Sequence, residues 1–255
     1  MKFNYYAFKA IYLHEMDRFR RTLMQSLLSP VLSTSLYFIV FGSVIGGYVE
    51  NIDGISYGSY IVPGLLMLTL LTQSISNTSF GIFFPKFNGT IYEILAAPIS
   101  TLEIVLAFVG AGATKTLIVG CMIFITSTFF VEVEVQFPIL MIFLLILVSF
   151  TFALFGFLIG LMSSNFEQMS IIPTRVITPM GFFGGSLYSL EMIPEFWQIV
   201  TYFNPVVYLI NGLRFSFYGV SDFNIWISVG LMLSFLIICI VTVSYTHLRA
   251  HETKA

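Results

Sequence analysis

The chain has 255 residues, of which 57% are hydrophobic and only 9% are charged, and its formal net charge is −2. A soluble domain carries about 25% charged residues, so this composition cannot cover a water-facing surface and excludes an ordinary soluble enzyme. It predicts an integral membrane protein built from helices, because lipid offers no partner to unpaired backbone groups.

The first 26 residues precede the first long apolar run and are rich in Lys and Arg. Apolar side chains recur there every three or four positions, and the bases suit contact with anionic lipid. We expect residues 1–26 to form an amphipathic interfacial helix on the cytoplasmic leaflet, with Arg18, Arg20 and Arg21 as interfacial anchors. The alternative is a positively charged flank that only fixes topology.

Six stretches approach the roughly 20 apolar residues that a membrane span needs. They cover residues 27–47, 60–80, 112–130, 138–162, 171–190 and 225–242, which predicts an all-α protein with six transmembrane helices. Apart from Arg214, every Lys and Arg before residue 243 lies on or near the side of the N-terminus. Since bases favour the cytoplasmic side, both termini are predicted to be cytoplasmic.

Two bases set the boundaries of the third and fifth spans. A charge at mid-bilayer costs about 2.5–3.5 kcal/mol on insertion scales, so the third span should begin near Gly112. Lys115 would then lie one turn inside and reach outward, while residues 99–110 lie along the cytoplasmic interface. Arg175 lies one turn into the fifth span, and we expect Lys115 and Arg175 to act as interfacial anchors.

Several kinds of chemistry are not supported by the sequence. The stretch "GAGATKT" lacks the glycine that a phosphate-binding loop places before its lysine, and before residue 243 the only histidine is His14, which leaves no intramembrane Ser–His pair. Acidic residues fall in loops or at span boundaries, whereas proton-coupled transporters place them within spans. Energy for transport is therefore expected from another subunit. A stand-alone six-helix secondary transporter or channel, and a scaffold without transport, stay open as alternatives.

The loop "FPKFNGTIYEILAAPIS" between the second and third spans predicts a short cytoplasmic helix. Asn88-Gly89 marks a turn, Thr90 and Glu93 have the spacing of a capping box, and Pro98 ends the helix. The segment is either a partner-binding helix or a structured loop. The residues expected to meet a partner are Phe87, Thr90, Tyr92, Glu93, Leu95 and Pro98.

The stretch "IPEFWQIVTYFNPVVYLINGLR" before the sixth span predicts two helices, each too short to cross a membrane. A proline opens the first, and an Asn-Pro pair supplies the N-cap and first-turn proline of the second. We expect the pair to dip into the outer leaflet and return, as an outer gate or as a lid that seals the bundle. The gate residues would be Pro194, Trp197, Asn204, Pro205 and Arg214.

The order of these features over residues 5–242 resembles the permease subunit of type-2 ABC exporters, in the multidrug-like or glycoconjugate-exporting branch. The most specific parts are "YEIL" at 92–95 with Pro98, and the proline, tryptophan, Asn-Pro and arginine of the outer pair. The resemblance implies that the loop helix couples to a separate ABC ATPase and that the outer pair closes the exit path. It implies two permeases, as a homodimer or heterodimer, with two ATPase subunits in a bacterial inner membrane. It further implies that this chain binds no cofactor, that ATP and magnesium lie on the ATPase, and that no nucleic acid is a partner.

The last thirteen residues, "VSYTHLRAHETKA", differ sharply in composition from the rest of the chain. His247 and His251 have the i, i+4 spacing of one helix face, but a metal site needs further ligands. The string resembles the in-frame translation of a transposase adapter used in sequencing libraries. Residues 243–255 are therefore interpreted as non-native and excluded from the fold.

Overall fold

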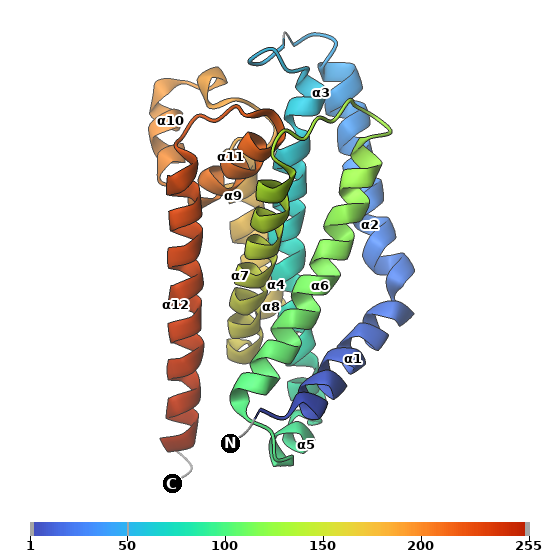
Figure 1. Ribbon diagram of the computed structural model, residues 1–255, viewed down its shortest axis with the longest axis vertical. Coiled ribbons are helices and arrows are strands. Elements are labelled where there is room, and N and C mark those ends of the chain that lie inside the picture. The colour runs from blue at the N-terminus through green and yellow to red at the C-terminus, as the bar shows by residue number, and fades with distance from the viewer. Residues whose placement is uncertain (1–2, 50, 253–255) are drawn as a thin grey trace.

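The computed structural model describes residues 3–49 and 51–252, except for the side chains of residues 43 and 246–252. The elements in this part of the chain are helices that form an elongated bundle (Figure 1). Five of them are long and apolar enough to cross a membrane: Leu23–Gly42, Tyr57–Asn88, Thr101–Ser127, Pro138–Met162 and Ile225–Tyr245. The prediction of an all-α membrane protein is confirmed.

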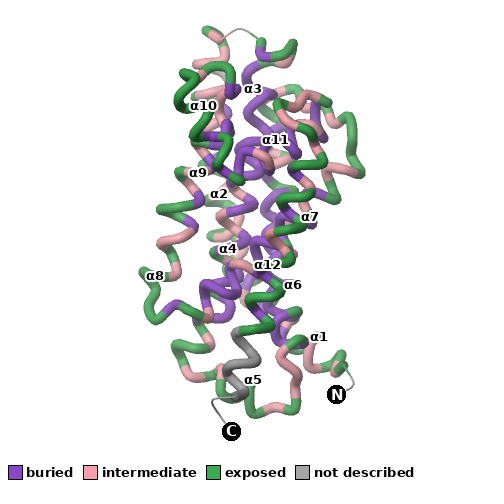
Figure 2. The backbone as a smooth tube through the Cα atoms, turned by 90° about the vertical axis from the view of Figure 1, so that its left-hand side faces the viewer, coloured by how far each residue is buried: buried purple, intermediate pink, exposed green. Residues whose placement is uncertain are grey.

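The centre of the bundle consists of α4 (Val62–Asn88), α6 (Thr101–Ser127) and α7 (Pro138–Met162). In the spans that contain them, 83%, 72% and 67% of the most apolar stretch is buried. The corresponding shares are 11% for the span that contains α2 (Leu23–Tyr37) and 17% for the span in α12 (Ile225–Glu252). Helix α2 continues as the π-helical segment Phe38–Ile45. Figure 2 shows the buried residues gathered along α4, so α2 and α12 form the periphery.

Two glycines of α7 let this helix rest directly on the backbone of α4. A Cβ atom added at Gly156 or at Gly160 would lie 2.5 Å from the carbonyl oxygen of Ile75 or Ser79, respectively. Residues four apart share one helix face, and small residues allow helices to approach closely in membranes. The fourth predicted span coincides with α7.

The N-terminal amphipathic helix is α1 (Tyr5–Arg21), and it ends before the predicted boundary at residue 26. Thr22 interrupts the helical backbone, and α2 starts at Leu23. The buried side chains of α1 are Ile11, Glu15 and Phe19, which recur every four residues. This stripe packs against α6, so the helix belongs to the bundle and does not rest on lipid alone.

The predicted start of the third span near Gly112 is wrong, because α6 is one continuous helix from Thr101. Residues 99–110 therefore do not form a separate interfacial segment. The prediction placed Lys115 near the interface because an unpaired charge inside the bilayer is costly. In the structure its ammonium group donates to Glu15 at 2.9 Å, so a carboxylate on α1 compensates the buried charge.

The predicted fifth span is displaced toward the N-terminus. Residues 166–183 form α8 (Phe166–Ile171), the π-helical segment Ile172–Ile177 and α9 (Thr178–Phe183), and the helix stops before Gly185, whose φ is +74°. Pro173 and Pro179 each remove a backbone donor, and the Thr178 hydroxyl donates to the Pro173 carbonyl at 2.9 Å. This proline-interrupted segment packs along α4 and is not among the five helices above.

The remaining helices lie at opposite ends of the bundle (Figure 1). Helix α5 (Ile91–Ala96) lies where α1 begins and α12 ends, which we call the α5 end. At the other end, the α11 end, lie α3 (Tyr57–Tyr60), α10 (Glu195–Tyr202) and α11 (Pro205–Tyr218), with a 3-10 turn at Leu190–Met192. Helix α12 runs past the predicted boundary at residue 242. The side chains of His247 and His251, and residues 253–255, lie outside the described part of the chain.

Candidate functional sites at the two ends of the bundle

At the α5 end, the chain reverses between α4 and α5 at a glycine. Gly89 has φ +81°, the left-handed conformation that ends α4 and that glycine adopts without steric cost. Ala97 is extended, as expected before Pro98. The predicted turn and the predicted end of the short helix are both confirmed.

Helix α5 packs on the bundle through the partly buried side chains of Ile91 and Ile94 and exposes its other residues. None of its residues is buried, and the Tyr92 and Leu95 side chains are 73% and 54% exposed. Phe87, at the end of α4, is also exposed. Figure 2 shows this corner at the edge of the bundle, with no buried stretch. Three large apolar side chains are thus available to another molecule.

The predicted capping box of α5 is wrong, because the Thr90 side chain makes no cap bond. Its hydroxyl donates instead to the Pro85 carbonyl at 3.4 Å. The capping box forms at the start of α6, where Glu103 accepts from the Ser100 backbone at 2.9 Å and the Ser100 hydroxyl accepts from the Glu103 backbone. The sequence carried this signal too, since Ser100 and Glu103 have the same spacing as Thr90 and Glu93.

The last turns of α4, which carry α5, are fixed to the ends of two other helices. The Lys86 ammonium donates to the carbonyls of Leu161 and Ser163 at 2.7 and 2.8 Å. The Phe166 ring lies edge-on to the rings of Phe83 and Phe87, at centroid distances of 4.9 and 5.1 Å. A force on α5 would therefore reach α7 and α8 as well as α4.

At the α11 end, α10 and α11 start as the sequence predicts. Pro194 precedes α10, and the Asn204 side chain accepts from the Val206 backbone at 3.0 Å, which confirms the N-cap of α11. The Asn204 amide also donates to the Met180 carbonyl at 2.6 Å. Trp197 stacks on Phe183 of α9 at a centroid distance of 5.8 Å. Both helices are thereby fastened to α9.

Arg214 joins three elements at the α11 end. Its guanidinium group is buried, lies 3.9 Å from the centre of the Tyr60 ring, and donates to the Gly185 carbonyl at 2.7 Å. Asp222, in the loop after α11, lies 3.9 Å from it. Burial raises the pKa of Asp222 above its ordinary range, although the charge of Arg214 opposes this shift. The arginine therefore ties α11 to the first turn of the second span and to the loop after α9.

The five expected interfacial anchors occupy different environments. Arg20 and Arg21 are exposed, and Arg175 is exposed beside Glu167 at 3.5 Å. Arg18 and Lys115 do not point outward: both bind the same oxygen of Glu15, at 2.7 and 2.9 Å. The sequence analysis did not identify Glu15, although its spacing of four from Ile11 and Phe19 places it on the buried stripe of α1.

Comparison with known proteins identifies the family. Residues 6–218 match the ABC-2 type transporter family. The chain is 37% identical to the inner membrane transport permease YadH of Escherichia coli (strain K12) over 231 residues, which cover 91% of this chain and 90% of that protein. It is 21% identical to Nodulation protein J of Rhizobium leguminosarum bv. viciae over 225 residues, or 86% and 85% of the two chains. The chain therefore belongs to the ABC-2 type transporter family of membrane transport proteins.

Proposed function

We propose that this chain is the permease subunit of an ATP-driven exporter, a transport subunit that couples to a separate ABC ATPase and carries out no catalysis itself. Two permeases, identical or related, would form the path together with two ATPase subunits, which would hold the ATP and magnesium. The name of the relative from Escherichia coli supports a place in the bacterial inner membrane. The clustering of basic residues at the α5 end favours an orientation with both termini in the cytoplasm.

The observation that carries this proposal is that α5 exposes large apolar side chains and is attached to the last turns of α4, which neighbouring helices hold in place. Ile91 and Ile94 seat the helix on the bundle, and Tyr92 and Leu95 are exposed. The α4 turns beneath it are bonded to the end of α7 and packed on the start of α8. An apolar patch exposed to water is typical of a protein-binding surface. Closure of an ATPase dimer against residues 87–98 would tilt α4, α7 and α8 together.

The path itself is proposed to follow a polar stripe along the middle of helix α4. Thr69, Thr72, Gln73, Ser76 and Asn77 are at least partly exposed among buried neighbours. Polar groups facing lipid would be costly, so this stripe is expected to face water or the second permease. Residues 166–183, which run along α4, would cross the membrane in addition to the five long helices and bring the number of spans to six.

The outer gate is proposed to be α10 with α11. At about 1.5 Å per residue, the 8 residues of α10 and the 14 of α11 are too short to cross a bilayer core of about 30 Å. Pro194, Trp197, Asn204, Pro205 and Arg214 would hold this pair over the end of the path. Asn204 and Trp197 contact α9, and these contacts would keep the pair in place.

The decisive experiment replaces Tyr92, Glu93 and Leu95 together by alanine. Because α5 has no buried residue, the variant should keep the thermal stability of the wild type. It should lose binding to the ATPase and stimulation of ATP hydrolysis in reconstituted vesicles. A matched control replaces three exposed residues of α1, Tyr6, Leu13 and Asp17. Normal transport by the α5 variant would refute coupling through this helix and favour a stand-alone transporter.

A further inference from the structure

Two basic side chains share one carboxylate between α1 and α6. One oxygen of Glu15 accepts from Arg18 at 2.7 Å and from Lys115 at 2.9 Å, and its other oxygen has no partner in the described part of the chain. The side chains of Glu15 and Lys115 are 2% and 4% exposed. Lys115 is buried with this carboxylate as an ion pair, whereas the second cation, Arg18, is partly exposed. The cluster keeps one excess positive charge.

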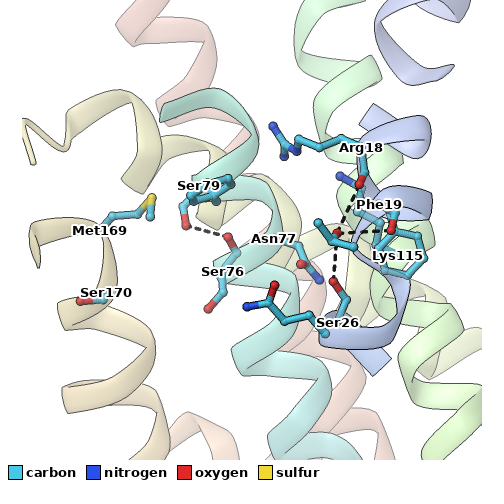
Figure 3. A pocket seen from close by; sticks show the side chains of 12 residues that line it. Arg18, Phe19, Ser26, Ser76, Asn77, Ser79, Lys115, Met169 and Ser170 are labelled. Carbon is cyan, nitrogen blue, oxygen red and sulfur yellow. Dashed lines mark hydrogen bonds between the residues drawn. The ribbon is translucent and has the colours of Figure 1, made fainter. Parts of the chain in front are cut away.

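This excess charge borders a cavity of about 420 Å³. The cavity lies between α1 and α2 on one side and α4 and α8 on the other, with Arg18 and Lys115 in its wall (Figure 3). Arg18 extends from α1 toward α4, and its guanidinium carbon lies 5.3 Å from the centre of the Phe80 ring. Arg18 is partly exposed, so some of its donors remain free to meet a ligand.

The rest of the wall combines hydrogen-bonding groups with apolar surface. The amides of Gln25 and Asn77 line the cavity, as do the side chains of Phe80 and Met169. None of the described residues that line it is acidic. A cationic ligand would thus find no counter-charge, whereas an anion would find a guanidinium group and amide donors, which form strong hydrogen bonds to charged oxygen.

From this arrangement we infer that the cavity binds the anionic headgroup of an amphipathic molecule, with phosphate or carboxylate chemistry. Arg18 supplies the direct ion pair, Lys115 adds positive charge to the wall, and Glu15 offsets part of this charge. Phe80 and Met169 contact the first carbons beyond the headgroup. Two sources fit this chemistry: an anionic lipid of the surrounding leaflet, or the exported molecule itself. The second source rests on the proposed export function; the binding site does not.

The test measures binding of dodecyl phosphate to the purified protein in nanodiscs of zwitterionic lipid by isothermal titration calorimetry. Arg18→Gln should weaken binding about tenfold or more, the range expected for one charge-assisted contact. Arg21→Gln removes the same charge from an exposed site of the same helix and should change affinity less than about twofold, since salt screens exposed charges. Asn77→Leu, which leaves all charges in place, should also weaken binding.

Glu15→Gln distinguishes a binding site from a purely structural ion pair. Removal of the carboxylate raises the excess charge, so dodecyl phosphate should bind about threefold tighter or more at low salt. A merely structural role predicts lower thermal stability without tighter binding. Arg18→Gln binding like the wild type, or dodecyltrimethylammonium or inorganic phosphate binding as tightly as dodecyl phosphate, would overturn the inference. Competition by phosphatidylglycerol would assign the site to lipid, and its absence to the exported molecule.

Discussion

The short helices α5 and α11 lie at opposite ends of the bundle (Figure 1) and differ in how far their residues are buried. Both follow a proline- or glycine-marked turn, but α5 buries none of its residues, whereas α11 buries most of its 14. Arg214 of α11 is bonded to backbone and packed on an aromatic ring, while Tyr92 of α5 touches solvent. The difference indicates that α11 belongs to the core of the fold, whereas α5 contributes little to it, as expected if α5 is the proposed ATPase-binding helix. Substitutions at the α11 end should therefore cost stability, and those in α5 should not.

The largest expected effect is that of Arg214→Ala. The variant loses the bond to Gly185 and the contact with Tyr60 and leaves Asp222 without its nearby cation, so the free energy of unfolding should fall by about 3 kcal/mol. Unfolding in mixed detergent micelles measures this change. The control Arg175→Ala breaks an exposed pair and should cost less than about 0.5 kcal/mol. Equal losses in the two variants would show that Arg214 stabilises the fold no more than an exposed arginine does.

Asn204→Ala should have the second-largest effect, about 2 kcal/mol, because it removes a helix cap and leaves a buried carbonyl unpaired. The lost bonds are those to the Val206 backbone and the Met180 carbonyl. The same unfolding assay applies. Asn204→Asp keeps the cap acceptor but cannot donate to Met180, so it should fall between the wild type and the alanine variant. If it matched the wild type, the bond to α9 would contribute nothing.

Ser100→Ala tests the capping box at the α5 end, outside α5 itself. The hydroxyl accepts from the Glu103 backbone at the start of α6, so its removal should lower the free energy of unfolding by about 1 kcal/mol. Ser100→Thr should restore most of the loss, since threonine also caps. A loss that threonine does not restore would point to packing and not to capping.

Thr90→Ala should have the smallest effect, below about 0.5 kcal/mol. Its hydroxyl makes no cap bond to α5, and its bond to Pro85 is long. Ser100→Ala is the matched comparison, because both residues precede a helix with Glu three positions later. A cost at Thr90 as large as that at Ser100 would show that α5 is stabilised from within and would weaken the contrast between the two ends.

Local sequence signals located most elements but not always the right boundary. The apolar run at 138–162 defines α7, and Asn204-Pro205 defines the start of α11. For the capping box, the sequence held two equivalent patterns, and local spacing could not decide between Thr90 and Ser100. For the fifth span, hydropathy suggested a helix to residue 190, but the chain turns at Gly185 with positive φ.

By itself, the sequence determined the membrane environment, the helical class and the places where short helices begin, because these follow from hydropathy, proline and capping groups close together in the chain. Only the tertiary structure decided which charges are tolerated inside. Glu15 and Lys115 are 100 residues apart in sequence yet 2.9 Å apart in space. An ion pair can offset the cost of burial only when the fold brings its members together, and no local pattern predicts that meeting. Helix α6 continues past Lys115, and Arg18, which binds the same oxygen of Glu15, lies beside the cavity.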